Sequence, residues 1–99
     1  MSKLYISEYS KVLTYGNKGI PVPIEPATEQ TPVTISGTSA QGAAFAADTL
    51  IVRIHSDVVC SILFSANPTA DVNDKRMSAG DTEYFAVSPG DKVAVISNT

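Results

Sequence analysis

Ser78-Ala79-Gly80-Asp81 stands before an alternating stretch at residues 82–87, and the similar phrase Ser88-Pro89-Gly90-Asp91 stands before residues 92–97. Each copy combines turn-forming residues with a run of β-branched, aromatic or small residues, which is the pattern of a tight turn followed by a strand. A spacing of about ten residues is typical of strands with short connections in an antiparallel sandwich or barrel. We expect the glycine of each copy to supply the turn conformation, and the aspartate to solvate the turn.

Residues 49–56 and 58–65 are the strongest strand candidates upstream of this repeat. Both alternate in the way expected of strands whose two faces differ, with Leu50, Val52 and Ile54 on one face of the first. Only a turn at about Ser56 and Asp57 separates them, so we predict two neighbouring strands. Their second faces are also partly apolar, and would be covered by the N-terminal region or used at an interface.

The remaining segments complete an all-β pattern without an amphipathic helix. Residues 3–9, 31–36 and 76–78 are further strand candidates, and residues 37–42 and 67–76 are predicted loops. Alanine-rich residues 43–48 suit either a helical turn or a strand, and the surrounding β elements favour a strand. The sequence therefore predicts a small antiparallel β-sandwich formed by residues 31–99.

Residues 1–30 are predicted to form an extended N-terminal arm followed by a proline-containing strap. Tyr5, Tyr9 and Tyr15 lie in this arm, where they either cover an edge of their own domain or contact another molecule. Prolines alternate with branched apolar residues at 20–26, which favours a polyproline-like strap with few ladder hydrogen bonds. The strap would lie along its own sandwich or across a neighbouring subunit.

Composition narrows the classes of function. The 99 residues suffice for one small domain, and domains of this size are often supplemented by oligomerisation or docking. The net charge of −3 argues against nucleic-acid binding, and residues 1–30, with three Lys and three Glu, are neutral. No signal peptide or membrane span is visible. Cys60 lies in an apolar strand pattern, which indicates a buried, reduced thiol and a chain assembled in a reducing cytosol.

Residues capable of catalysis or metal binding are sparse. His55 is the only histidine and Cys60 the only cysteine, which is too few for a four-ligand zinc site without carboxylates. A Cys–His nucleophile pair would need an orienting acid that no spacing supplies. Asp71-Val72-Asn73-Asp74 has only a faint likeness to a calcium loop, because Lys75 follows where an oxygen ligand is expected. We therefore expect no catalytic residues, no metal and no cofactor.

Several phrases together resemble small virion-associated proteins of tailed bacteriophages. They are KLYISEY at residues 3–9, VRIHSD at 52–57, FSANPTA at 64–70, TEYF at 82–85 and PGDKVAVI at 89–96. The resemblance is strongest from about residue 49 onward. It implies a β-sandwich, with a jelly roll as one candidate form, in a capsid decoration or cement protein that docks between capsomers. Its motifs are turn and strand phrases, so it carries over no active-site residues.

The expected partners are the major capsid protein and further copies of the chain, in the virion and, during assembly, in the host cytoplasm. We expect the arm and strap to provide the protein interface. Its candidate residues are Tyr5, Ile6, Tyr9, Leu13, Tyr15, Ile20, Val22 and Ile24. The alternatives are a head–tail connector or tail protein, a fibre-associated module that binds host surface or carbohydrate, and, least favoured, a small enzyme.

Overall fold

The computed structural model describes residues 2–15 and 20–98, which form only β-strands and their connections. The strands are β1 (Lys3–Tyr9), β2 (Val12–Tyr15), β3 (Ile20–Pro23), β4 (Thr28–Glu29), β5 (Val33–Thr34), β6 (Ala40–Gln41), β7 (Ile51–Ser56), β8 (Cys60–Ser65), β9 (Lys75–Met77), β10 (Thr82–Ala86) and β11 (Lys92–Ser97). Every strand pairing is antiparallel. The all-β antiparallel fold expected from the sequence is therefore confirmed.

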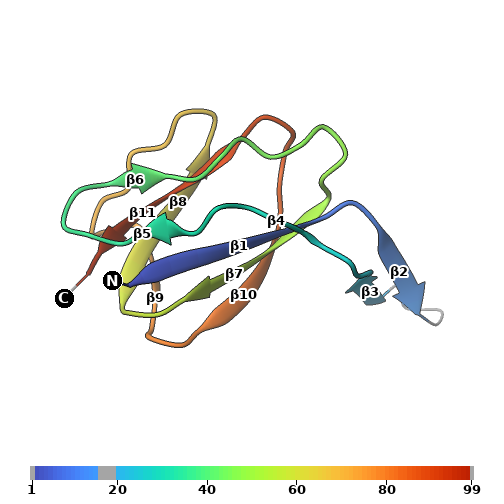
Figure 1. Cartoon of the computed structure of the whole chain (residues 1–99), viewed down its shortest axis with the longest axis horizontal. Helices are drawn as coiled ribbons and strands as arrows, with labels where there is room; N and C mark the ends of the chain where they lie inside the picture. The colour runs from blue at the N-terminus through green and yellow to red at the C-terminus, as the bar shows by residue number, and fades with distance from the viewer. Residues whose placement is uncertain (1, 16–19, 99) are drawn as a thin grey trace.

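Two sheets pack face to face as a sandwich (Figure 1). The first sheet has the order β10-β7-β1-β4, and β5 pairs with β1 beside β4. The amide of Gln30, between β4 and β5, also donates to the carbonyl of Ile6, so residues 28–34 form one interrupted edge along β1. The second sheet has the order β6-β11-β8-β9. Strands β2 and β3 form a separate two-stranded hairpin.

The chain repeatedly crosses from one sheet to the other. Strands β5, β6, β7 and β8 alternate between the sheets, β8 and β9 are neighbours, and β10 and β11 alternate again. This is the strand order of a jelly roll, an arrangement that limits exposed edges in an all-β domain. In a jelly roll, one more strand would follow β11 in the chain and would lie between β5 and β7. In this structure the N-terminal strand β1 occupies that place.

Strands β7 and β8 do not pair with each other, which corrects the expectation of two neighbouring strands. Strand β7 pairs with β1 and β10, whereas β8 pairs with β11 and β9. The turn at Ser56 and Asp57 instead carries the chain across the sandwich. The two strands face each other across the core, where Ser56 Oγ lies 3.2 Å from Cys60 Sγ. Alternation was read correctly in each strand, but it does not distinguish a partner beside the strand from one opposite it.

Strand β1 is an internal strand, which corrects the expected boundary at residue 30. It lies between β7 and the β4–β5 edge (Figure 1). Its Leu4 and Ile6 side chains are buried in the core. They pack in a cluster with residues from both sheets, among them Val52, Ile54, Cys60, Ile62, Met77, Val93 and Val95. Residues 3–9 are therefore part of the sandwich, and only the hairpin projects from it.

The two copies of the repeated phrase form the same turn. The amide of Asp81 donates to the carbonyl of Ser78 at 3.1 Å, and Gly80 has a φ of 80°. In the second copy Gly90 has a φ of 84°. A positive φ at the third turn position belongs to a type II turn, in which glycine avoids the clash of a side chain. The expected role of both glycines is thus confirmed.

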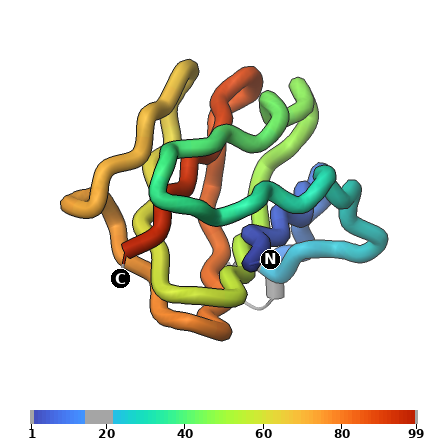
Figure 2. Tube along the Cα trace, turned by 60° about the vertical axis from the view of Figure 1, so that its left-hand side comes forward, coloured from blue at the N-terminus to red at the C-terminus, as the bar shows by residue number. Residues whose placement is uncertain are grey.

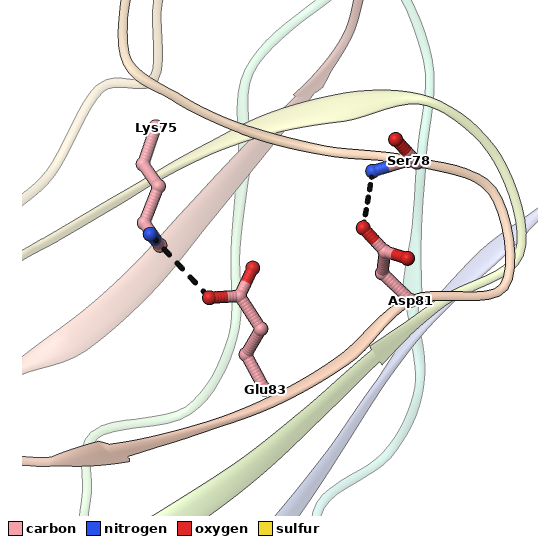
Figure 3. Close-up of polar contacts among 4 residues, drawn as sticks. All are labelled: Lys75, Ser78, Asp81 and Glu83. Atoms are coloured by element: carbon pink, nitrogen blue, oxygen red, sulfur yellow. Dashed lines mark hydrogen bonds and ion pairs between the residues drawn. The ribbon is translucent and has the colours of Figure 1, made fainter.

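Each turn is also fixed to a distant segment by two backbone hydrogen bonds. Gly80 N donates to Ser56 O at 2.8 Å, and Ser56 N donates to Asp81 O at 3.1 Å. Phe45 has the same reciprocal relationship with the second turn, at 3.0 and 2.8 Å. The Asp81 carboxylate accepts a 2.9 Å bond from Ser78 N, as Figure 3 shows. This aspartate therefore stabilises the turn directly, in addition to being solvated.

Strands β9 and β10 lie in different sheets and are joined through the first of these turns. Lys75 Nζ on β9 lies 3.4 Å from Glu83 Oε1 on β10, across the side of the sandwich (Figure 3). The Lys75 side chain is 50% exposed and that of Glu83 is 35% exposed, so solvent screens the ion pair and it contributes little to stability. The ion pair shows that β9, at the edge of the second sheet, lies close to β10, at the edge of the first.

The outer face of the second sheet is covered by the connection between β8 and β9. This connection runs beside β8 in Figure 2. Pro68 and Ala70 within it are buried, and Gln41 Nε2 on β6 donates to Pro68 O at 2.7 Å. Ser61 Oγ on β8 donates to Val72 O at 3.2 Å. The partly apolar second face of this sheet is therefore covered by the chain's own loop.

Two local expectations were wrong. Residues 43–48 form no strand: they make an irregular loop whose one large apolar side chain, Phe45, is buried. The predicted loop at 37–42 contains the short strand β6, which pairs with β11. Alanine and glycine give weak local signals, and in both segments the buried contacts of the neighbouring residues decide the conformation.

Candidate protein-interaction surface on the projecting hairpin

The β2–β3 hairpin extends from one end of the sandwich. The described residues span 43 × 24 × 22 Å, and the hairpin forms one end of the long axis in Figure 1. Val12 pairs with Pro23, and Leu13 pairs with Val22. The proline-rich stretch is therefore a paired strand, which corrects the expected strap. Its prolines are tolerated because they stand where no amide is needed by β2.

The base of the hairpin is fixed to the sandwich. Ile24 N donates to Lys11 O at 3.0 Å, which closes the base. Tyr9, at the end of β1, donates through its hydroxyl to Glu25 Oε2 at 2.7 Å. Burial, followed by the hydrogen bond and charge of Glu25, raises the pKa of Tyr9 to about 12. The hairpin thus leaves the sandwich at a defined anchoring point.

One face of the hairpin exposes three aliphatic side chains. Leu13 and Val22 share a face because they are directly paired, and Ile24 is two residues beyond Val22. Their exposed fractions are 44%, 38% and 38%. Apolar side chains gathered on a projecting element, without cover from the described residues, are typical of a surface that binds protein. We call Leu13, Val22 and Ile24 the hairpin face.

An apolar cleft of about 550 Å³ separates the hairpin from the first sheet. It is lined by Val22, Pro23, Ile51, Tyr84, Phe85 and Ala86. Tyr84, on the outward side of β10, is 55% exposed, so its ring is available beside the cleft. Tyrosine offers a large contact area at low entropic cost, and it is enriched at protein interfaces. The cleft therefore extends the apolar surface from the hairpin onto the sandwich.

The outer face of the first sheet is aromatic and polar. The pairing register places Tyr5 beside His55, and Arg53 beside Tyr84. The Tyr5 and His55 rings lie 6.2 Å apart, and His55 Nδ1 lies 2.7 Å from Thr82 Oγ1. These contacts fix the histidine ring within the sheet surface. His55 is therefore placed as part of a surface, with a hydroxyl as its hydrogen-bond partner.

The predicted interface residues fall into three groups. Tyr5, Leu13, Val22 and Ile24 are exposed and available for contact. Ile6 and Tyr9 are 1% and 4% exposed, which corrects their assignment: Ile6 belongs to the core, and Tyr9 anchors Glu25. Tyr15 and Ile20 pair through their backbones in the hairpin, but their side chains lie outside the described part of the structure.

Tyr84 and Ile51 were missed as members of this surface. Tyr84 alternates with the inward-facing Phe85, so the sequence could have placed it on an outer face. Its proximity to the hairpin could not be inferred, because the two segments are far apart in the chain. Ile51 was missed for the same reason, because it is far from the hairpin in the chain and yet lines the same cleft as Pro23.

Cys60 and His55, the residues considered for catalysis or metal binding, do not lie together. Cys60 is a buried free thiol, as the sequence indicated, and burial raises its pKa, which suppresses the reactive thiolate. It lies in the core, whereas His55 lies on an outer face. Within residues 2–15 and 20–98, no group of three or more His, Cys, Asp or Glu side chains could hold a metal ion. In the same ranges, no helix could span a membrane.

Comparison with known proteins identifies no relative: no family model matches the chain, and neither a curated protein nor a solved structure gives a significant match.

Proposed function

We propose that this chain is a structural protein of a tailed-bacteriophage virion, a capsid decoration protein that attaches to the head through its hairpin face and the adjoining cleft. The observation that carries the proposal is the exposed set Leu13, Val22 and Ile24 on a hairpin that projects from a compact jelly roll. The phrases that resemble those of small virion-associated proteins support the major capsid protein as the partner.

The mechanism is stabilisation by binding. A protein that binds the assembled shell but not free capsid subunits shifts the equilibrium toward the shell, by an amount set by its concentration and affinity. The hydrogen bond between Tyr9 and Glu25 restrains the base of the hairpin, which lowers the entropy lost on docking. The −3 charge carried by residues 31–99 lies outside the hairpin and keeps the rest of the protein in solvent.

Co-sedimentation with purified heads that lack this chain tests the proposal. Val22→Asp places a charge in the hairpin face and is expected to abolish binding, because an unpaired charge is costly to bury. Val72→Asp is the matched control: Val72 is 52% exposed on the loop that covers the opposite sheet, and its variant should bind normally. Equal binding by both variants would overturn the assignment of the hairpin.

A second candidate is a connector, tail or fibre-associated module that binds host surface or carbohydrate. The observation that favours it is the outer face of the first sheet, where Tyr5 and Tyr84 are exposed on either side of His55 and Arg53. Quantitative protein analysis of purified particles separates the two proposals. Decoration requires a copy number comparable to that of the capsomers, whereas a few copies per particle would favour the connector or fibre.

A further inference from the structure

The two long edges of the hairpin differ in their capacity to accept another strand. The bond from Ile24 N to Lys11 O makes these residues a hydrogen-bonded pair. Because such pairs alternate along an antiparallel ladder, Leu13 and Val22 are also a hydrogen-bonded pair, and Val12 with Pro23 and Thr14 with Pro21 are not. The backbone groups of the second set point away from the hairpin.

Prolines close one of these edges. On β3 the outward positions are Pro21 and Pro23, which have no N–H to offer to a further strand. On β2 the outward positions are Val12 and Thr14, and each presents both an N–H and a C=O. No strand among the described residues pairs with this edge of β2. The hairpin therefore has one edge that is blocked and one that is open.

The open edge faces away from the sandwich. The cleft between hairpin and sandwich is lined by Val22 and Pro23 of β3, and none of the described side chains of β2, at residues 12–14, lines it. In Figure 1, β2 is the outermost strand of the molecule. A strand from another molecule can therefore approach β2 without meeting the sheets.

We infer that the open edge of β2 pairs with the same edge of a second copy of this chain, antiparallel and about a two-fold axis at Leu13. Val12 of each copy then lies opposite Thr14 of the other, and these two pairs form four N–H···O=C hydrogen bonds. Leu13 lies opposite Leu13 of the second copy in the non-hydrogen-bonded position, where side chains are closest. The product is a four-stranded sheet with a proline-closed edge at each side.

Self-complementarity and charge favour a second copy as the occupant. Centring the pairing on Leu13 uses every outward backbone group of Val12 and Thr14 in both molecules, which is the isologous contact of a two-fold dimer. Strand β2 carries no charged residue, and the net charge of −3 belongs to residues 31–99, away from the contact. Like charges are therefore not placed opposite each other.

The dimer should be weak, because the contact is short. Four-residue edges bury far less than the roughly 1,200 Å² of a stable specific interface. The inference does not rest on the proposed function: pairing uses the edge of β2, and leaves the aliphatic face free for docking. A chain that dimerises but fails to bind heads, or the reverse, would separate the two.

Disulfide trapping in the full chain tests the register. Leu13→Cys places two thiols opposite each other at a spacing that a disulfide can bridge, so mild oxidation should convert it mainly to covalent dimer on non-reducing gels. Thr14→Cys is the matched control, since Thr14 is also exposed but its counterpart is displaced along the strand. It should remain largely monomeric. Buried Cys60 is common to both variants.

Charge exchange provides a second test that does not require a disulfide. Leu13→Lys and Leu13→Glu should each be monomeric in sedimentation velocity, because like charges meet at the two-fold axis, and an equimolar mixture should form a heterodimer. Equal cross-linking of the two cysteine variants, or a mixture that sediments as monomer at concentrations where the natural chain dimerises, would overturn the inference. So would a natural chain that stays monomeric at every accessible concentration.

Discussion

The hydroxyl of Tyr9 donates a 2.7 Å hydrogen bond to Oε2 of Glu25, and this contact joins an internal strand of the jelly roll to the base of the projecting hairpin. Tyr9 is therefore not an external contact residue, although its position in a terminal segment suggested one. Its buried hydroxyl determines where the hairpin leaves the sandwich. The contact also has a pH dependence that can be measured.

Stability should fall as the pH rises through the interval in which Tyr9 titrates. The pKa of this group is raised from 10.0 to about 12 in the folded protein, so between these values the unfolded chain releases a proton that the folded chain retains. The free energy of unfolding is therefore fully supported below pH 10 and declines toward pH 12. Urea unfolding across this interval measures the decline.

Tyr9→Phe is the control for this titration. The variant should lose about 0.5–1.5 kcal/mol below the interval, because it removes a hydrogen bond. Its stability should then depend less on pH than that of the natural chain. A natural chain and a variant with parallel pH profiles would show that Tyr9 does not titrate as described.

Gly80 and Gly90 should each lose stability when a side chain is added. With φ values of 80° and 84°, Gly80→Ala and Gly90→Ala should each destabilise the protein by about 1–2 kcal/mol, the cost of the left-handed conformation for an L-residue. Gly37→Ala is the control, because an added Cβ there meets no atom within 4 Å and its φ is not left-handed. Thermal unfolding compares the three, and equal midpoints would contradict the turn assignment.

Glu8 is expected to be the most sensitive carboxylate of the sandwich. Its Oε1 accepts from Thr49 Oγ1 at 2.6 Å and from Ala46 N at 3.0 Å, and its Oε2 accepts from Gln30 Nε2 at 2.9 Å. Glu8→Gln replaces one acceptor oxygen with an NH₂ that faces a donor. The unfolding free energy should drop by about 1–3 kcal/mol.

Glu29→Gln is the matched control for Glu8. Glu29 is exposed and accepts one bond from Ser7 Oγ through Oε1, which a glutamine oxygen can replace. Its variant should unfold at nearly the same urea concentration as the natural chain. Equal losses for the two variants would show that the Glu8 contacts are not specific.

Much of the fold could be predicted from local patterns. The repeated turns, the strands at residues 3–9, 82–86 and 92–97, and the buried Cys60 all follow from residue type and alternation. What could not be predicted is the partner of each strand. Alternation shows that Val52 and Cys60 face inward, but the same pattern arises whether the next strand lies beside or across the core.

The candidate site was also predicted correctly where local pattern decides exposure, and wrongly where long-range strand pairing decides it. Leu13, Val22 and Ile24 were predicted to be interface residues because they are apolar and lie in an N-terminal arm and strap that was expected to contact another molecule, and all three are exposed. Ile6 and Tyr9 were assigned to the same surface because strand β1 was treated as an arm. Its long-range pairing with β7, which buries both side chains, leaves no local signal in the sequence.

Removal of the hairpin and removal of β1 should have opposite effects on folding. Replacing residues 12–23 with a short Gly–Ser turn leaves the sandwich core intact, so thermal unfolding should remain cooperative and head binding should be lost. Deleting residues 2–9 removes Leu4 and Ile6 from the core, and the remaining chain should not fold. Circular dichroism and hydrogen exchange distinguish these outcomes; a folded chain without β1 would contradict its internal position.

An electron cryomicroscopy map of heads saturated with the natural chain is the most direct test of the proposed docking. We expect density for the jelly roll on the head surface, with Leu13, Val22 and Ile24 against capsid subunits and the loop around Val72 in solvent. Density with the hairpin in solvent and the second sheet against the shell would contradict the proposed docking, as would density confined to the neck or tail.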